Sequence, residues 1–237
     1  MNIAIIIAGG SGKRMLQDIP KQFLTVDDIP VIVYTLEAFQ KNAQIDEICV
    51  VTLTGWTDVV KAYAKQFGIT KLTHVCLGGE VGQQSIFNGL MCIKDIAHDD
   101  DAILIHDAIR PMVSQEIIND CITKCREYGN AISVIPCNEV MLKSTNDVYS
   151  DLCVPRDNLK RTQTPQAVLF KQFLELHQEA KEKGITASIA TASLLTELGH
   201  RVYYSLGSEK NIKLTTPDDL DIFKALLHSK RSDWIHA

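Results

Sequence analysis

Near the start of the chain, an unbroken run of apolar, mostly β-branched residues at positions 3–8 leads directly into two glycines. A strand that is apolar at every position has no face suited to water, so we expect other elements to cover both of its sides. Strands of this kind occur in parallel sheets, whose two faces are both packed with helices. The run therefore predicts an α/β protein in which strands and helices alternate.

The rest of the chain continues this alternation, which predicts a mainly parallel, Rossmann-like, doubly wound sheet with helices on both faces. We expect strands at residues 3–8, 47–53, 73–77, 102–106, 131–136 and 201–204, and helices at residues 31–41, 58–67, 84–96, 114–128, 170–183, 186–198 and 217–227. Asp58, Ser114 and Thr216 are the expected N-terminal caps of three of these helices.

The alternation breaks at Cys137. Residues 138–161 contain short alternating runs around a turn-prone stretch at residues 144–147, a pattern that is typical of a β-hairpin. We therefore expect a β-arm that projects from the sheet. The chain length suits a single domain, which we expect to span residues 1–237.

Charge and cysteine content limit the classes of function. A net charge of −5 argues against a generally basic surface for nucleic acid. The seven cysteines are scattered singly except Cys121 and Cys125, so we expect reduced thiols in the cytoplasm. Cys121 and Cys125 have no histidine nearby, so we expect no zinc site at that pair. The N-terminal apolar run is too short for a signal peptide or a membrane span, so no membrane insertion is expected.

The turn after the first strand carries AGGSGKRM at residues 8–15. A Walker A loop needs Ser or Thr after Gly-Lys, but Arg14 follows here, and a dinucleotide fingerprint needs a third glycine where Met15 stands. What remains is a turn whose N–H groups can approach anionic oxygens beside cationic side chains. Taken alone, the turn is explained equally well as a tight strand-to-helix connection with solvated basic residues.

Further motifs follow this turn in order along the chain. They are PKQ at residues 20–22, GGEVGQQS at 78–85, HDAIRP at 106–111, VPR at 154–156, QTPQ at 163–166 and NIKLTTPDDL at 211–220. Together they resemble the signature of the polyol-phosphate cytidylyltransferase family, which includes enzymes for ribitol 5-phosphate and for methylerythritol phosphate. The pattern spans nearly the whole chain.

The resemblance implies a nucleotide-diphospho-sugar-transferase-like fold, an activity and a set of partners. Such enzymes join CTP to a polyol phosphate, with Mg²⁺, and release pyrophosphate. The acceptor's phosphate oxygen attacks the α-phosphorus of CTP, and positioning and electrostatics supply most of the catalysis. The resemblance also implies a homodimer formed through the β-arm.

The same resemblance implies roles for individual residues. Arg14, Lys21 and Lys213 match catalytic cations around the phosphates. The residues expected to bind the nucleotide are Ala8, Gly9, Gly10, Ser11, Gly12, Gly79, Glu80 and Ser85. A carboxylate is a natural ligand for Mg²⁺, and Asp107 matches the family's metal-binding acid.

Asp107, Arg156 and Thr164 match positions that bind the substrate, with Arg156 reaching from the arm into the neighbouring subunit's site. A loop acid or helix cap remains the alternative for Asp107, and plain arm structure for the other two. We expect His106 to support its loop rather than to catalyse, and Arg110 to pair locally.

Three positions depart from the family pattern. Gly82 stands where an arginine is usual, Val140 replaces the threonine of an Asp-Thr pair, and Ala190 replaces a second carboxylate. Losing one charge-assisted contact costs about 1.5–3 kcal/mol. The departures count against methylerythritol phosphate as the acceptor and suggest a differently shaped polyol phosphate.

Three hypotheses follow. The leading one is a cytidylyltransferase that makes a CDP-polyol from ribitol 5-phosphate or a similar acceptor, for cell-wall (teichoic acid) or capsule polymers. The second is the methylerythritol-phosphate enzyme of isoprenoid synthesis. The third is a nucleotide-binding relative with weak or no catalysis, which the losses at Gly82 and Ala190 would explain.

Overall fold

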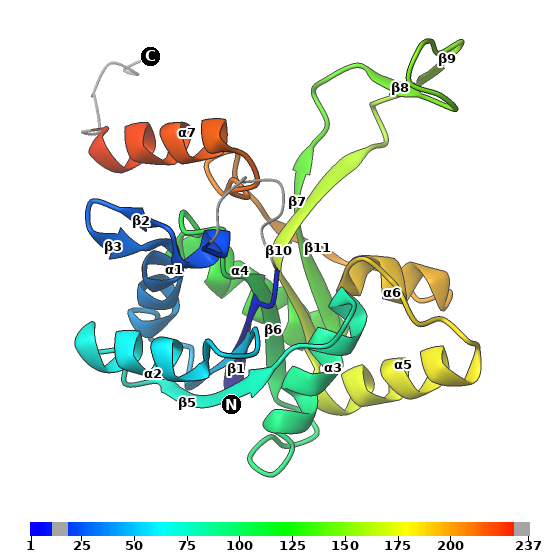
Figure 1. Ribbon diagram of the computed structural model, residues 1–237. Helices are drawn as coiled ribbons and strands as arrows, with labels where there is room; N and C mark the ends of the chain where they lie inside the picture. The colour runs from blue at the N-terminus through cyan, green and yellow to red at the C-terminus, as the bar shows by residue number, and fades with distance from the viewer. Residues whose placement is uncertain (11–18, 230–237) are drawn as a thin grey trace.

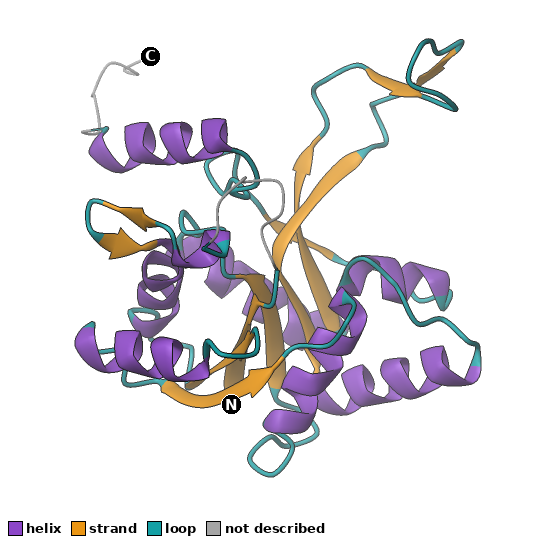
Figure 2. Ribbon diagram, viewed as in Figure 1, coloured by secondary structure: helices purple, strands orange, loops and turns teal. Residues whose placement is uncertain are grey.

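The computed structural model describes residues 1–10 and 19–229. Within them, a seven-stranded sheet has the order β11-β7-β10-β6-β1-β4-β5, and helices lie on both of its faces (Figures 1 and 2). This arrangement confirms the expected doubly wound α/β fold. No helix in the described ranges has the length and apolar character needed to span a bilayer.

The bounds of the elements are as follows. The strands of the central sheet are β1 (Asn2–Ala8), β4 (Glu47–Thr52), β5 (Leu72–Leu77), β6 (Ala102–Asp107), β7 (Asn130–Pro136), β10 (Lys160–Leu169) and β11 (Tyr204–Leu206). The helices are α1 (Val31–Gln40), α2 (Thr57–Gln66), α3 (Gly82–Cys92), α4 (Gln115–Tyr128), α5 (Phe170–Glu182), α6 (Thr191–Glu197) and α7 (Pro217–His228). The shorter elements are η2 (Lys21–Phe23), β2 (Thr25–Val26), β3 (Ile29–Pro30), β8 (Met141–Lys143) and β9 (Leu152–Val154).

Strand β1 lies in the middle of the sheet and pairs in parallel with β4 and with β6. Its alternate side chains enter two separate cores: Ala4 and Ile6 pack with α1, α2 and α4, whereas Ile3 and Ile5 pack with α3, α5 and α6. All four residues are fully buried. The unbroken apolar run is explained by this burial on both sides.

Strand β10, which inserts antiparallel between β6 and β7, is not among the expected strands. Its polar stretch contains Pro165, which lacks the N–H that a central strand needs and so argues against such an assignment. The register on β7 shifts between Thr162 and Gln166, so the proline falls in an irregular part of the strand. As a result, an antiparallel strand brings the QTPQ motif next to the end of β6.

Two expected elements are displaced. The last strand is Tyr204–Leu206 rather than residues 201–204, and α6 begins at Thr191 rather than at residue 186. The residues before α6 instead form a loop that is held by side-chain hydrogen bonds, described below. Neither displacement changes the layers of the fold.

Two of the three expected caps are confirmed. The Ser114 hydroxyl accepts a hydrogen bond from the N–H of Ile117, and Thr216 forms a capping box with Asp219. The prediction for Asp58 was wrong: α2 begins after Trp56, and Asp58 lies in its first turn. An acid there still interacts favourably with the positive end of the helix dipole.

The expected arm is present as a hairpin in which β8 and β9 pair antiparallel. It projects away from the sheet on extensions of β7 and β10 (Figure 1). Several of its apolar side chains are exposed, including Val140, Leu142, Val148 and Tyr149.

Candidate active site

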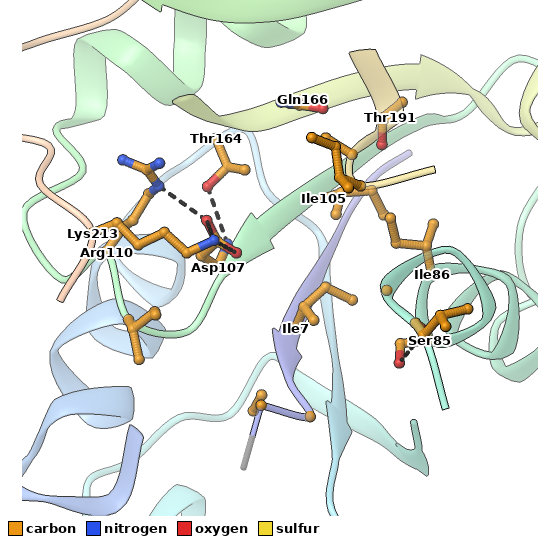
Figure 3. Close-up of a pocket in the computed structure, with 18 of the residues that line it drawn as sticks. Ile7, Ser85, Ile86, Ile105, Asp107, Arg110, Thr164, Gln166, Thr191 and Lys213 are labelled. Carbon is orange, nitrogen blue, oxygen red and sulfur yellow. Dashed lines mark hydrogen bonds and ion pairs between the residues drawn. The ribbon is translucent and has the colours of Figure 1, made fainter. Parts of the chain in front are cut away.

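A pocket of about 600 Å³ lies at the carboxyl ends of β1 and β6 (Figure 3). Parallel sheets commonly bind ligands at this edge, because the loops that follow neighbouring strands meet there. Ten of the residues expected from the sequence line the pocket, namely Ala8, Gly9, Gly10, Lys21, Gly79, Glu80, Ser85, Asp107, Thr164 and Lys213. Six separate motifs therefore converge on one cavity.

Four other expected residues do not line this pocket as the structure describes it. Ser11, Gly12 and Arg14 lie outside the described residues. Arg156 lies in the arm after β9, and its guanidinium donates a hydrogen bond to the carbonyl oxygen of Asn138. Arg156 therefore contacts its own arm and does not line the pocket of its own chain.

Asp107, at the end of β6, is the centre of a cluster of charges on one side of the pocket. Its carboxylate accepts a hydrogen bond from Nε of Arg110 at 3.0 Å and lies 3.1 Å from Nζ of Lys213. Burial would raise the pKa of Asp107, but the charges of Lys213 and Arg110 outweigh it and hold the pKa below its usual value. Arg110 pairs locally, as expected, and Asp107 is ionised at neutral pH.

His106 and Thr164 fix the backbone at Asp107. The Thr164 hydroxyl accepts a hydrogen bond from the N–H of Asp107 at 3.1 Å and lies 3.1 Å from Nδ1 of His106. Nε2 of His106 lies 3.2 Å from the carbonyl oxygen of Arg110, which can only accept, so Nε2 carries the proton and Nδ1 accepts from Thr164. Burial lowers the pKa of His106 to about 4, which keeps the ring neutral. The loop-supporting role expected for His106 fits this geometry.

Gln22 organises the start of the glycine turn. Its buried amide group donates hydrogen bonds to the carbonyl oxygens of Ala8, at 2.6 Å, and Gly10, at 3.1 Å. Lys21, the neighbour of Gln22 on η2, lines the pocket on the same side. The PKQ motif therefore supplies both a cation and the residue that holds the turn in place.

The loop between β5 and α3 forms another wall. The Ser85 hydroxyl accepts a hydrogen bond from the N–H of Gly79 at 3.0 Å and donates one to the carbonyl oxygen of Val81. A Cβ atom at Gly79 would collide with the side chain of Gln84, so glycine is required by the close packing of this turn. Small residues and backbone groups line this wall, which suits the flat edge of a base.

The side of the pocket opposite the glycine turn carries no charge. Thr191, Gln166, Ile105 and Ile86 lie there (Figure 3). Thr191 is 2% exposed, and its hydroxyl has no hydrogen-bond partner among the described protein groups. The pocket thus has a charged half around Asp107 and a neutral half around Thr191.

Two glutamines hold the loop that carries this neutral half. Gln83 donates a hydrogen bond to the carbonyl oxygen of Ile185 and accepts one from the N–H of Ser188, both at 2.8 Å. Gln166 accepts one from the N–H of Ala192 at 3.0 Å. Hydrogen bonds therefore hold the backbone both before Thr191, at Ser188, and after it, at Ala192.

Gln22, Gln83, Gln166 and Thr191 are not among the site residues expected from the sequence. The PKQ and QTPQ motifs contained a signal for Gln22 and Gln166. Gln83 also lies within a motif, GGEVGQQS, but its role depends on a contact between α3 and the loop before α6 that this pattern does not encode. Thr191 lies in none of these motifs.

Comparison with known proteins gives one consistent family. The family model described as IspD, 2-C-methyl-D-erythritol 4-phosphate cytidylyltransferase, matches residues 2–229. A ribitol-5-phosphate cytidylyltransferase from Lacticaseibacillus paracasei is 42% identical over 97% of this chain and 99% of its own length. One from Vibrio parahaemolyticus is 39% identical over 98% of each chain.

A solved structure gives the same result for the fold. The 4-diphosphocytidyl-2C-methyl-D-erythritol synthase of Anaerococcus prevotii superposes with a TM-score of 0.79 at 25% identity, covering 96% of this chain and 98% of its own.

Proposed function

The chain belongs to the IspD family of cytidylyltransferases, and from this membership we propose that it transfers the cytidylyl group of CTP to a polyol phosphate. Pyrophosphate is the second product. The observation that carries the proposal is the convergence of the glycine turn, Lys21, Asp107 and Lys213 on one pocket. A reaction that moves a phosphoryl group between oxyanions needs a fixed set of opposite charges, which this half of the pocket provides.

We propose ribitol 5-phosphate or a similar polyol phosphate as the acceptor. Support comes from two relatives, 42% and 39% identical to the chain over nearly their full length, which are named for that substrate. The neutral half of the pocket suits the uncharged, hydroxyl-bearing chain of such an acceptor, while its phosphate lies toward Lys213. A CDP-polyol is an activated unit for cell-wall polymers such as teichoic acid, or for a capsule.

We further propose that Asp107 holds Mg²⁺ when CTP is bound. The ion prefers oxygen ligands and usually takes one or two carboxylates, with water and substrate phosphates completing its shell. Asp107 supplies an ionised carboxylate at the charged half of the pocket, so the donor set fits. When bound, the ion would offset the charge that builds on the phosphate oxygens.

In this proposal, the chain's own residues position the reactants. The backbone of Ala8–Gly10, held by Gln22, lies beside the triphosphate, and Lys21 and Lys213 offset negative charge on the α-phosphate and on the leaving pyrophosphate. Gly79, Glu80 and Ser85 receive the cytosine. Thr164 and His106 keep Asp107 in place, and Thr164, which lines the pocket, also contacts the acceptor.

We also propose a homodimer in which the arm reaches the neighbouring subunit. The exposed apolar side chains of the hairpin, such as Leu142 and Val148, give such a contact an apolar surface to bury. Arg156 would then bind the acceptor phosphate in the neighbour's pocket. Sedimentation of the intact protein should give twice the mass of one chain, and Arg156→Ala should raise the KM for the acceptor without changing the mass.

The function is tested by incubating purified protein with CTP, Mg²⁺ and a panel of acceptors that includes ribitol 5-phosphate and 2-C-methyl-D-erythritol 4-phosphate. We expect pyrophosphate release to be fastest with a pentitol phosphate and to stop when the metal is chelated. Preference for the methylerythritol substrate would assign the chain to isoprenoid synthesis instead. No turnover with any acceptor, with CTP still raising the melting temperature, would favour a nucleotide-binding relative without catalysis.

We also propose that the protein is cytoplasmic. Its seven free cysteines are consistent with that location.

A further inference from the structure

Three cysteines from three different elements meet on the face of the sheet covered by α3. They are Cys49 on β4, Cys76 on β5 and Cys92, the last residue of α3. Their sulfur atoms all lie within 4.8 Å of one another. Within residues 1–10 and 19–229, no other group of three or more His, Cys, Asp or Glu side chains is close enough to hold a metal ion. The expectation that the cysteines are scattered therefore holds along the chain but not in space.

The fold brings the three together for definite reasons. In the parallel pairing of β4 and β5, Cys49 lies opposite His74, and Cys76 comes two residues later, on the same face of the sheet. A Cβ atom at Gly89 of α3 would lie 2.7 Å from Ile5, so the helix sits close against the sheet at its glycine. Cys92 follows three residues later, on the same side of the helix.

The cluster is also accessible. Cys49 is fully buried, whereas Cys76 and Cys92 are half-buried, so the group opens toward solvent on one side. All three thiols are free. The thiolate is the form of cysteine that binds metals, and metal binding releases the thiol proton.

We propose that Cys49, Cys76 and Cys92 form a binding site for Zn²⁺. Zinc is bound by cysteine sulfur at about 2.3 Å in tetrahedral geometry, which places ligand sulfurs roughly 3.8 Å apart, a small contraction from the present cluster. Zinc binding displaces the thiol protons of the three cysteines. The fourth position, on the open side, is filled by water or by His74.

Such an ion would join β4, β5 and α3 directly beneath the wall that we assign to the base. β5 leads into Gly79, and α3 carries Ser85 in its first turns. Packing as small apolar side chains is the alternative explanation for three neighbouring cysteines. It predicts no saturable binding of metal.

The test uses the reduced, chelator-treated full chain, titrated with Co²⁺ as a spectroscopic probe and then with Zn²⁺. We expect a thiolate-to-cobalt charge-transfer band that saturates at one equivalent, is displaced by Zn²⁺, and accompanies a rise in melting temperature. Cys76→Ser and Cys92→Ser should each abolish the band at one equivalent, whereas Cys153→Ser, on the exposed arm, should keep it. His74→Ala weakens the d–d bands if the imidazole is the fourth ligand and leaves them unchanged if water is.

Two results would overturn the proposal: no stoichiometric band in the wild-type protein, or a band that persists in Cys76→Ser and Cys92→Ser. A second measurement needs no variant. Zn²⁺ should protect Cys76 and Cys92, but not Cys153, from alkylation mapped by mass spectrometry, and equal labelling with and without Zn²⁺ would also refute the site. Turnover is not needed for either measurement, so the outcome is independent of the proposed function.

Discussion

Replacing Thr191 by valine should change stability and acceptor binding in opposite directions. Valine has the same shape but lacks the hydroxyl, which is buried at the neutral wall of the pocket and has no partner among the described protein groups. A buried, unpaired hydroxyl costs about 1–3 kcal/mol of folding free energy, so the variant should be more stable by roughly 1 kcal/mol or more. For a chain of this size, 1 kcal/mol corresponds to a shift of about 2–4 °C in melting temperature.

The opposite change is expected for the acceptor. If a hydroxyl of the polyol pairs with Thr191, its loss removes a hydrogen bond worth about 0.5–1.5 kcal/mol, which is roughly a 2- to 10-fold rise in the KM for the acceptor. The KM for CTP should not change, because the nucleotide lies against the Gly79–Ser85 wall in the proposed arrangement. Thr191→Ser keeps the hydroxyl and is the matched control, with an acceptor KM near that of the wild type.

The assays are thermal unfolding without ligand and steady-state kinetics with each substrate varied in turn. A fall in melting temperature for Thr191→Val would mean that the hydroxyl supports the fold. A rise in the KM for CTP alone would mean that the neutral half receives the nucleoside. Either result, or an unchanged acceptor KM, would refute the assignment of this wall to the polyol.

Other predictions concern the charged half, the base wall and the buried histidines. Asp107→Asn should lower kcat/KM by at least ~100-fold while the circular dichroism spectrum stays unchanged, because a neutral amide cannot hold the cation or balance the neighbouring charges. Asp107→Glu keeps the charge and should retain more activity. An equal loss of activity in both variants would mean that the position of the carboxylate matters as much as its charge. Gly79→Ala should raise the KM for CTP but not for the acceptor, because the added methyl displaces Gln84. Burial lowers the pKa of His106 and of His177 to about 4, whereas a histidine in an unfolded chain has a pKa near 6.5. Between these two values the unfolded state binds more protons than the folded state. The free energy of unfolding should therefore fall as the pH drops from about 6.5 toward 4, by at most roughly 3 kcal/mol per histidine. His177→Phe should remove about half of that loss in denaturant titrations at pH 7 and pH 5, and an undiminished loss would place the acid sensitivity elsewhere.

The sheet was predictable where strands are apolar on both faces. Residues 3–8 and 102–106 are continuous runs because both sides of β1 and β6 are buried, and this burial is what the sequence encodes. β10 was not predictable in the same way. Its polar residues face a pocket and its proline falls at a shift in register, so neither periodicity nor propensity marks it as a central strand.

The same distinction applies to the site. Family motifs pointed to Asp107 and Lys213, and the structure brings these two residues within 3.1 Å of each other. Residues that act by holding a loop, such as Gln83, depend on contacts between parts of the chain about a hundred positions apart. The convergence of Cys49, Cys76 and Cys92 depends likewise on strand register and on the close approach of α3, which no local pattern contains.

The three departures from the family pattern can now be placed in the fold. Nothing lies within 4 Å of a Cβ atom built at Gly82, so packing does not exclude a larger side chain there. Val140 is 69% exposed on the arm, and Ala190 lines the neutral half of the pocket, where it caps α6 without a side-chain hydrogen bond. Packing does not force the replacement at Gly82, and both Gly82 and Ala190 line the pocket, so we attribute these two replacements to the ligand.

Their distribution supports that attribution. The described charged half keeps Lys21, Asp107, Arg110 and Lys213, whereas the second acid of the family pattern is missing at Ala190, beside Thr191. A carboxylate at that wall would bind a polyol hydroxyl as an acceptor only, whereas the threonine hydroxyl both donates and accepts. With the proposed function, the change would alter which hydroxyl pattern the wall recognises, as expected for relatives that share a reaction and differ in the polyol.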